Sequence, residues 1–404
     1  MINMADILVL KIGGSILSDR ESMNKATNTI KSVLSRGFSV AVVVSAMKGV
    51  TDQLLSEARK KDSNASPETI AEILSTGEMT SARILTEVLN AENISATLVD
   101  PNSTHWPIFT DNDYLDANPI YKDIKNKVEE EIRPLIEKGI VPVICGFLGI
   151  GPSGKITTMG RGGSDTTAVL MGSSLGAKEI VLIKDVDTIF SSDPDQVDNP
   201  IALDNLDSDE AYALASGGAK FLHAKALRYI NKDTKIRISS LSEDEFRGTV
   251  IDGGNFNLEV EKSDEDVSMI TIVGERSREK EQLQLLVNTI EKASGRVISF
   301  TLDPRAFVVY VSGGVGLLNQ VHDFVVKNKF GKAVSSFEDL SIISVKGRAL
   351  ETSPGMIQRV TQPLAKHRIN VYGVLTITSS IRILVSRDQE QMALSMLRES
   401  LVEI

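Results

Sequence analysis

The chain has 404 residues, of which 42% are hydrophobic and 24% are charged, and its formal net charge is -10. This length exceeds one comfortable hydrophobic core, so two or three domains are expected. The acidic balance argues against nucleic acid as a general partner, because binding to a phosphate backbone needs a cationic face. The single cysteine, Cys145, excludes an internal disulfide, and four scattered histidines make no zinc site.

The apolar stretch before Lys11 is too short for the core of a signal peptide, and no later apolar run is long enough to span a membrane. We therefore expect a cytoplasmic protein with no membrane partner. Any anionic substrate would have to be bound by local cations.

The first part of the chain alternates apolar runs with amphipathic stretches, which is typical of an α/β fold with a largely parallel sheet covered by helices. Apolar runs predict strands at residues 7–11, 39–45, 141–146, 179–184 and 235–240. The stretches between them predict helices at residues 23–35, 66–89, 123–137, 164–175, 208–216 and 222–231. A polar, acidic stretch at 255–266 is the best linker candidate.

After this stretch a short pattern of strands and helices occurs twice. The first pass predicts a strand at 269–273, a helix at 279–293, strands at 297–302 and 307–311, and a helix at 317–327. The second predicts a strand at 341–346, a helix at 355–367, strands at 370–376 and 381–386, and a helix at 389–401. Two βαββαβ-like units of similar length indicate a duplicated small domain.

The turn Gly160-Arg161-Gly-Gly-Ser164-Asp165 joins glycines to a predicted helix start. Amides at a helix N-terminus attract anions, and glycines allow the backbone to approach a ligand closely. Arg161 carries a planar fork suited to a carboxylate, and Asp165 can orient a cation. The alternative is that Ser164 or Asp165 only caps the helix.

Two predicted strands end in polar residues at the edge of the sheet where α/β proteins bind ligands. The first ends in Lys11-Ile-Gly-Gly-Ser15, whose glycine amides and lysine suit a phosphate group, although a solvated lysine in a plain turn is the alternative. The second is followed by Ser45 and Thr51, which can bind a ligand or cap a helix. Glu78 follows a glycine inside a predicted helix, where it is either solvated or close to a ligand.

A loop at 184–194 follows a third predicted strand and combines Lys184 and Phe190 with several aspartates. Such a loop can hold a nucleotide, with the ring near the base and the lysine near phosphate, although Asp-rich turns are common without a ligand. EF-hand spacing is absent, because Phe190 stands where a glycine is needed. No metal site made of protein side chains is predicted.

Taken in order, these segments resemble the aspartokinases of the amino-acid-kinase superfamily. The matching segments are Lys11-Ile-Gly-Gly-Ser15, Val44-Ser-Ala-Met-Lys-Gly-Val-Thr-Asp52, Gly77-Glu78, Gly146-Phe-Leu-Gly149, Thr157-Thr-Met-Gly-Arg-Gly-Gly-Ser-Asp165, Lys184-Asp-Val-Asp187 with Asp193-Pro194, and Gly218-Ala-Lys-Phe-Leu-His223. The resemblance covers essentially the whole chain, because the second tail repeat, with Ser353-Pro-Gly355, is similar to the ACT domains that follow such kinases.

The resemblance implies a three-layer αβα sandwich with a mainly parallel sheet, followed by two ferredoxin-like βαββαβ (ACT) units. It implies a catalytic domain at 1–254, a linker at 255–267, and ACT-like domains at 268–335 and 336–404. The partners that the resemblance implies are a small-molecule substrate and a second copy of the chain, bound through the ACT domains as a homodimer or higher homo-oligomer.

The activity implied by the resemblance is phosphoryl transfer from MgATP to the side-chain carboxylate of L-aspartate, the first step towards lysine, threonine and methionine. Lys11 would stabilise the transferring group, and Asp165 would orient Lys11. Arg161 would bind the substrate α-carboxylate and Glu78 its ammonium. The other implied contacts are Ser45, Thr51 and Ser164 for the substrate, and Gly13, Gly14, Ser15, Lys184, Asp185, Phe190 and Asp193 for the nucleotide. Mg²⁺ would be held mainly by the ATP phosphates.

The chain departs from the family pattern at several positions. Ile12 replaces an aromatic residue, Lys184 and Phe190 replace a threonine and a tyrosine of the nucleotide loop, and a lysine that some relatives carry after the strand ending at Ser240 is missing. Lys184 is the candidate to substitute for that lysine. His223-Ala-Lys225 replaces a frequent His-Pro-Arg and is assigned no chemistry.

An effector site for lysine or threonine at Ser353, Pro354 and Gly355 is also implied by the resemblance, and the alternative is that the repeats only dimerise. Two other functions stay open from the sequence. One is a kinase of another small acid, such as acetylglutamate, and the other is an inactive amino-acid sensor. Retention of Lys11, Glu78, Arg161 and Asp165 argues against a sensor.

Overall fold

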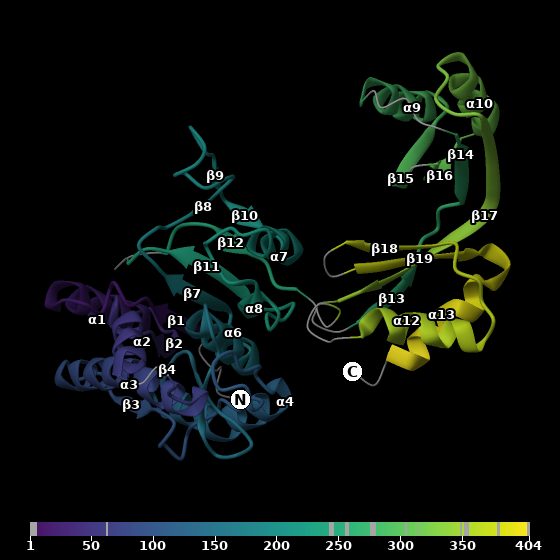
Figure 1. Cartoon of the computed structure of the whole chain (residues 1–404). Helices are drawn as coiled ribbons and strands as arrows, with labels where there is room; N and C mark the ends of the chain where they lie inside the picture. The colour runs from purple at the N-terminus through teal and green to yellow at the C-terminus, as the bar shows by residue number, and fades with distance from the viewer. Residues whose placement is uncertain are drawn as a thin grey trace. The chain divides into compact units, whose positions relative to one another are not determined.

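The computed structural model describes residues 6–61, 64–241, 246–254, 258–274, 280–303, 305–314, 316–347, 350, 355–377 and 380–401. The chain divides into two compact units, Met1–Phe256 and Asn257–Ile404 (Figure 1). Each unit has hydrophobic cores of its own. No helix of the described part of the chain is long and apolar enough to cross a membrane.

The first unit is built on an eight-stranded sheet with the order β10-β12-β11-β7-β1-β2-β4-β3. Its strands are β1 (Ile7–Ile12), β2 (Ser39–Val44), β3 (Ala96–Val99), β4 (Val141–Cys145), β7 (Glu179–Ile183), β10 (Asn205–Leu206), β11 (Lys235–Ser239) and β12 (Val250–Ile251). All neighbouring strands run parallel except β11 and β12, which are antiparallel. The predicted mainly parallel sheet is therefore confirmed.

All six residues of β1 are buried, which shows that both faces of the sheet are covered at this strand. The helices are α1 (Arg20–Ser35), α2 (Val50–Lys61), α3 (Pro67–Ala91), α4 (Tyr121–Lys127), a π-helical turn (Val128–Ile132), α5 (Arg133–Glu137), α6 (Gly163–Leu175), α7 (Ser208–Ser216) and α8 (Ala224–Leu227). Two small antiparallel pairs complete the unit: β5 (Leu148–Ile150) with β6 (Ile156–Thr158), and β8 (Ile189–Phe190) with β9 (Ala202–Leu203).

Several elements of the first unit differ from the sequence prediction: helix α2 and the short strands β5, β6, β8, β9, β10 and β12 were not predicted. Strand β3 was missed, because it is short and only one of its four residues is fully buried. The predicted helix at 222–231 is reduced to the four residues of α8, which begins where His223 accepts a hydrogen bond from the Lys225 N–H. Helix α3 runs unbroken through Gly77, where a Cβ would lie 3.0 Å from the Cβ of Ala46. The glycine thus marks close packing between segments and no helix break.

The second unit has a seven-stranded sheet with the order β15-β16-β14-β17-β19-β18, and β13 also pairs with β17. Its strands are β13 (Glu259–Lys262), β14 (Val267–Val273), β15 (Gly295–Leu302), β16 (Ala306–Gly313), β17 (Ala333–Lys346), β18 (Gly373–Ile377) and β19 (Ser380–Ser386). Its helices are α9 (Lys280–Lys292), α10 (Leu317–Lys327), α12 (Met356–Lys366), a 3-10 turn (Arg387–Gln389) and α13 (Glu390–Leu401). Two apolar cores, one beneath α9 and α10 and one beneath α12 and α13, correspond to the two predicted repeats.

The two repeats are joined differently from the prediction. Strand β17 runs through the predicted boundary between residues 335 and 336, and it pairs with β14 along its first half and with β19 along its second. The predicted linker contains β13, which pairs antiparallel with the second half of β17. The sequence did not predict β13, because it is an edge strand with Val260 buried and Glu259 and Glu261 exposed, and its composition resembles that of a loop. The first repeat is thus inserted between two strands of the second.

Candidate active site

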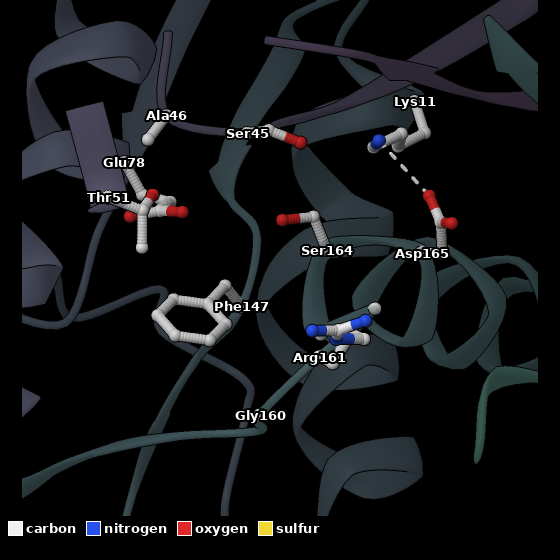
Figure 2. Close-up of a pocket in the computed structure, with 12 residues that line it drawn as sticks. Lys11, Ser45, Ala46, Thr51, Glu78, Phe147, Gly160, Arg161, Ser164 and Asp165 are labelled. Atoms are coloured by element: carbon white, nitrogen blue, oxygen red, sulfur yellow. Dashed lines mark ion pairs between the residues drawn. The ribbon is translucent and has the colours of Figure 1, made fainter. Parts of the chain in front are cut away.

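A pocket of about 280 Å³ lies in the first unit, next to the carboxyl ends of β1 and β2 and the N-terminus of α6. All seven residues predicted to be catalytic or to bind the substrate line this pocket (Figure 2). Its lining consists of Lys11, Ser45, Ala46, Thr51, Glu78, Phe147, Gly160, Arg161, Gly162, Gly163, Ser164 and Asp165. The pocket therefore lies at the edge of the parallel sheet where the sequence predicted ligand binding.

The turn after β1 packs directly on the turn after β2. The Lys48 N–H donates to the Gly14 carbonyl oxygen at 3.0 Å, and the Ser45 N–H donates to the Ile12 carbonyl oxygen at 3.3 Å. A Cβ on Gly14 would lie 2.1 Å from the Ala46 carbonyl oxygen, so only glycine fits there. These contacts fix the ends of both strands, and with them Lys11 and Ser45, at the wall of the pocket.

Asp165 lies in the first turn of α6 and is buried between two lysines from neighbouring strands. Its Oδ1 is 3.1 Å from Nζ of Lys11, and its Oδ2 is 2.9 Å from Nζ of Lys184. Burial alone would raise the pKa of Asp165, but the charges of Lys11 and Lys184 outweigh burial and hold this pKa well below its ordinary value. The cluster of two ammonium groups and one carboxylate therefore carries a net positive charge at neutral pH.

Lys184 follows β7 and has a second partner besides Asp165. Its Nζ donates to the Phe221 carbonyl oxygen at 2.6 Å, and its backbone N–H donates to the Ser239 carbonyl oxygen at 2.8 Å. The contact between Lys184 and Asp165 was not predicted, because nothing in the local sequence links positions 19 residues apart. The structure brings Lys184 into the same charge cluster as Lys11.

Glu78 lies in α3 on the opposite side of the pocket, as Figure 2 shows, and is only 3% exposed. Burial raises the pKa of its carboxyl to about 7, against the opposing effects of the Ala46 N–H and the charge of Lys11. Its Oε2 has no hydrogen-bond partner among the described residues. An unpartnered buried carboxylate oxygen is a binding position for a cationic group.

Arg161 projects from the turn between Gly160 and Gly162, both of which have the left-handed conformation, with φ of 69° and 74°. The side chain is exposed, and no carboxylate of the described ranges forms an ion pair with it. Gly163 follows, where a Cβ would lie 2.7 Å from the ring of Phe147. Arg161 is thus available to bind an anionic ligand. Figure 2 shows it on the same side of the pocket as Ser164.

Phe147 and Ala46 line the pocket but were not predicted as site residues. Phe147 has φ of 68° and is held there by its backbone, since its N–H donates to Thr167 Oγ1 at 3.1 Å and its carbonyl oxygen accepts from the Met159 N–H at 2.8 Å. The only sequence signal was its place within the Gly146-Phe-Leu-Gly149 segment.

The residues predicted to bind nucleotide lie outside the lining of this pocket. They are Gly13, Gly14, Ser15, Lys184, Asp185, Phe190 and Asp193. Two of them meet across the sheet edge, since Ser15 Oγ donates to Asp185 Oδ1 at 2.6 Å. The carboxylate of Asp193 accepts local hydrogen bonds from the Asp195 N–H and from the Gln196 side chain. Among the described residues, no group of three or more His, Cys, Asp and Glu side chains is placed to hold a metal ion.

Of the predicted effector residues, Ser353 and Pro354 lie outside the described residues. Gly355 has φ of 82° and stands at the N-terminus of α12 in the second unit.

Replacing Glu78 with glutamine is expected to flatten the pH dependence of stability in the absence of ligand. A carboxyl whose pKa is raised to about 7 in the folded chain, from an ordinary value of 4.5, stabilises the fold fully below pH 4.5 and loses this effect as the pH rises to 7. The free energy of unfolding of Glu78→Gln at pH 8 should therefore exceed that of the wild type by on the order of 1–3 kcal/mol, with little difference at pH 4.5.

Chemical denaturation at both pH values measures this effect. Glu87→Gln, on the exposed side of the same helix, is the matched control and should behave as the wild type does at both pH values. A Glu78→Gln variant that retained the whole pH dependence of the wild type would show that Glu78 ionises normally in the folded chain.

Comparison with known proteins identifies the family. The model of the amino acid kinase family matches residues 6–240, and a model of the ACT domain matches residues 335–399. The aspartokinase of Geobacillus stearothermophilus is 27% identical over 96% of this chain and 94% of its own length. The aspartokinase of Rickettsia felis is 32% identical over 63% of this chain, and the match spans 62% of that relative.

Solved structures show the same fold. Escherichia coli aspartokinase III in complex with aspartate and ADP aligns with a TM-score of 0.54 and 21% identity over 98% of this chain and 100% of that one. The aspartate kinase of Synechocystis aligns with a TM-score of 0.71 and 22% identity over 98% of this chain and 69% of that one. Because the family model covers more than half of its length, the chain belongs to the amino acid kinase family, and an ACT domain follows the part that this model matches.

Proposed function

We propose that this protein is an aspartokinase, which transfers the γ-phosphoryl group of ATP to the side-chain carboxylate of L-aspartate and yields 4-phospho-L-aspartate and ADP. The relatives that match along nearly the whole chain are named as aspartokinases or aspartate kinases. The observation that carries the proposal is one pocket whose lining combines Lys11 and Asp165 with Glu78, whose Oε2 is unpartnered, and with the available guanidinium of Arg161. Lys184 lies outside this lining and reaches the pocket only through its ion pair with Asp165.

The charges of the pocket are complementary to those of aspartate. Arg161 binds the α-carboxylate with its planar fork, and Glu78 binds the α-ammonium. The side-chain carboxylate then lies towards Lys11, which neutralises the charge of the acceptor and of the incoming phosphoryl group. Ser45, Thr51 and Ser164 line the same pocket and supply hydrogen bonds. An amino acid without a side-chain carboxylate would leave Lys11 without a partner from the substrate.

The nucleotide is proposed to bind beside Lys11, on the far side from Glu78. Gly13 and Gly14 are proposed to lie against the phosphate groups. The Gly14 amide is the proposed donor to a phosphate oxygen, because the Gly13 N–H already donates to the Ile183 carbonyl oxygen at 3.3 Å. Ser15, Lys184, Asp185, Phe190 and Asp193 complete this half, and Lys184 supplies a second cation near the phosphates. Mg²⁺, held mainly by the ATP phosphates, would add further charge neutralisation.

The chemistry needs no general base, because a carboxylate is already a competent nucleophile. Catalysis then depends on in-line positioning of the two reactants and on neutralisation of the transferring group. Lys11 lies between the proposed substrate and nucleotide halves, and Asp165 keeps it there. Such a kinase works where ATP is available, and a cytoplasmic location stays a prediction.

The second unit is proposed to be regulatory and to mediate self-association. The face of its sheet opposite the helices carries a cluster of apolar residues that are buried within the chain: Val267, Tyr310, Leu340, Ile342 and Leu384. Phe337 stacks on Tyr372 beside this cluster, with ring centroids 4.5 Å apart, and remains 40% exposed. A second copy of the chain is the proposed partner of this face.

The decisive experiment incubates the purified protein with MgATP, hydroxylamine and each candidate acid in turn, and measures the hydroxamate formed from a trapped acyl phosphate. Hydroxamate is expected with L-aspartate and not with acetylglutamate. Lys11→Met should lower the rate with aspartate by about a thousandfold or more, because it removes a charge that acts on the transferring group.

Lys178→Met, at an exposed ion pair with Asp6, is the control and should keep the wild-type rate. Hydroxamate with acetylglutamate alone would assign the other kinase function. Absence of product with every acid, despite ATP binding, would indicate a sensor.

L-lysine or L-threonine is proposed as an inhibitor that binds the second unit. One aspartokinase structure of the same fold is described in complex with lysine and aspartate. At saturating concentration at least one of the two amino acids should lower the aspartate-dependent rate about fivefold or more, whereas L-alanine should not. An unchanged rate with both amino acids would show that neither regulates the enzyme, and self-association would remain the proposed role of the second unit.

A further inference from the structure

Lys225 is a buried lysine outside the pocket, and the proposed reaction does not use it. Its side chain is 5% exposed and projects from the short helix α8. A buried ammonium group is costly unless its three N–H groups are all paired. Here all three have acceptors: Asp116 Oδ1 at 2.7 Å, the Asp116 carbonyl oxygen at 3.2 Å and the Met159 carbonyl oxygen at 3.1 Å. Lys225 therefore has no donor left for a ligand.

These three acceptors belong to the two segments that surround Arg161. Met159 directly precedes the Gly160-Arg161-Gly162 turn, and Asp116 lies beneath it, since a Cβ on Gly160 would be 2.4 Å from Asp116 Oδ1. The opposite side of the turn rests on the segment that carries Lys225, since a Cβ on Gly162 would be 2.3 Å from the Cβ of His223. The turn thus lies between the segment of Asp116 and the segment of His223, and Lys225 links these two segments by hydrogen bonds.

The loop that supplies Asp116 is itself held firmly. Asp113 Oδ1 accepts hydrogen bonds from the N–H groups of Leu115 and Asp116, and the Ala117 N–H donates to the Thr158 carbonyl oxygen at 2.9 Å. The Lys225 ammonium therefore connects two preordered segments. It fixes the backbone from which Arg161 projects.

We propose that Lys225 is a positioning residue for substrate binding: through Asp116 and Met159 it holds the Arg161 turn in the geometry that binds the α-carboxylate of the substrate. The catalytic part of this inference rests on the proposed function. Its structural part, the restraint of the turn, does not. Because Lys225 acts only through Arg161, its loss should weaken binding of the amino acid and leave the phosphate half of the site intact.

The kinetic test compares Lys225→Met with the wild type in the full-length protein. The KM for aspartate should rise about 10-fold to 100-fold, while kcat changes less than about threefold and the KM for ATP less than about twofold. In the background of Arg161→Ala, Lys225→Met should add less than about a threefold change in the KM for aspartate, because the residue through which it acts is gone. Equal effects on both substrates, or the same increase in both backgrounds, would overturn the proposal.

Two further variants separate positioning from a loss of stability. Asp116→Asn removes the charged partner at a side chain that is 72% exposed, so it should fold and still raise the KM for aspartate. Arg237→Met breaks a partly buried ion pair with Glu179 on the strands of the same unit and should leave that KM unchanged. An unaltered KM in Asp116→Asn, or an equal rise in Arg237→Met, would overturn the proposal.

Hydrogen exchange tests the restraint without any substrate. The amides of residues 160–163 should exchange at least about tenfold faster in Lys225→Met and in Asp116→Asn than in the wild type, and at the wild-type rate in Arg237→Met. Unchanged exchange in both Lys225→Met and Asp116→Asn would overturn the inference, whatever the substrate is. If exchange is faster in both variants but the wild-type protein neither binds nor phosphorylates aspartate, the proposed function is refuted. The restraint of the turn by Lys225 would then still stand.

Discussion

A single buried carboxylate, Asp165, organises the charge of the whole site. The parallel pairing of β1 with β7 brings Lys11 and Lys184 to the same edge of the sheet, where two ammonium groups in a buried environment would repel each other. Asp165, in the first turn of α6, lies between them and contacts both. The site therefore has a fixed pair of cations with one positive charge in excess, which suits the transfer of an anionic group.

The two halves of the site depend on different supports. On the phosphate side, the strand ends are locked by backbone hydrogen bonds and by glycines that no other residue can replace, as at Gly14. On the substrate side, Arg161 lies on a turn of two left-handed glycines, and packing against Asp116 and His223 encloses it. Lys225 is bonded to both the loop and the turn. A residue without any contact to ligand thus becomes part of recognition.

Local patterns in the sequence predicted the parallel sheet and seven of the residues that line the pocket, but not Phe147 or Ala46. What could not be predicted is long-range. The contact of Lys184 with Asp165 depends on strand order, and the backbone conformation of Phe147 depends on its neighbours in space. Strand β13 resembles a linker because only Val260 faces the core, and its pairing with β17 shows only in the folded chain.

The most direct test of this account is the single-turnover rate of acyl-phosphate formation in Asp165→Asn, with aspartate and MgATP both saturating. Asparagine keeps the shape of the side chain but removes the charge that holds the two lysines, so the rate should fall by about a thousandfold or more. The variant should still bind ADP, since Gly13 and Gly14 are unchanged. A rate within tenfold of the wild type would contradict the central role of Asp165.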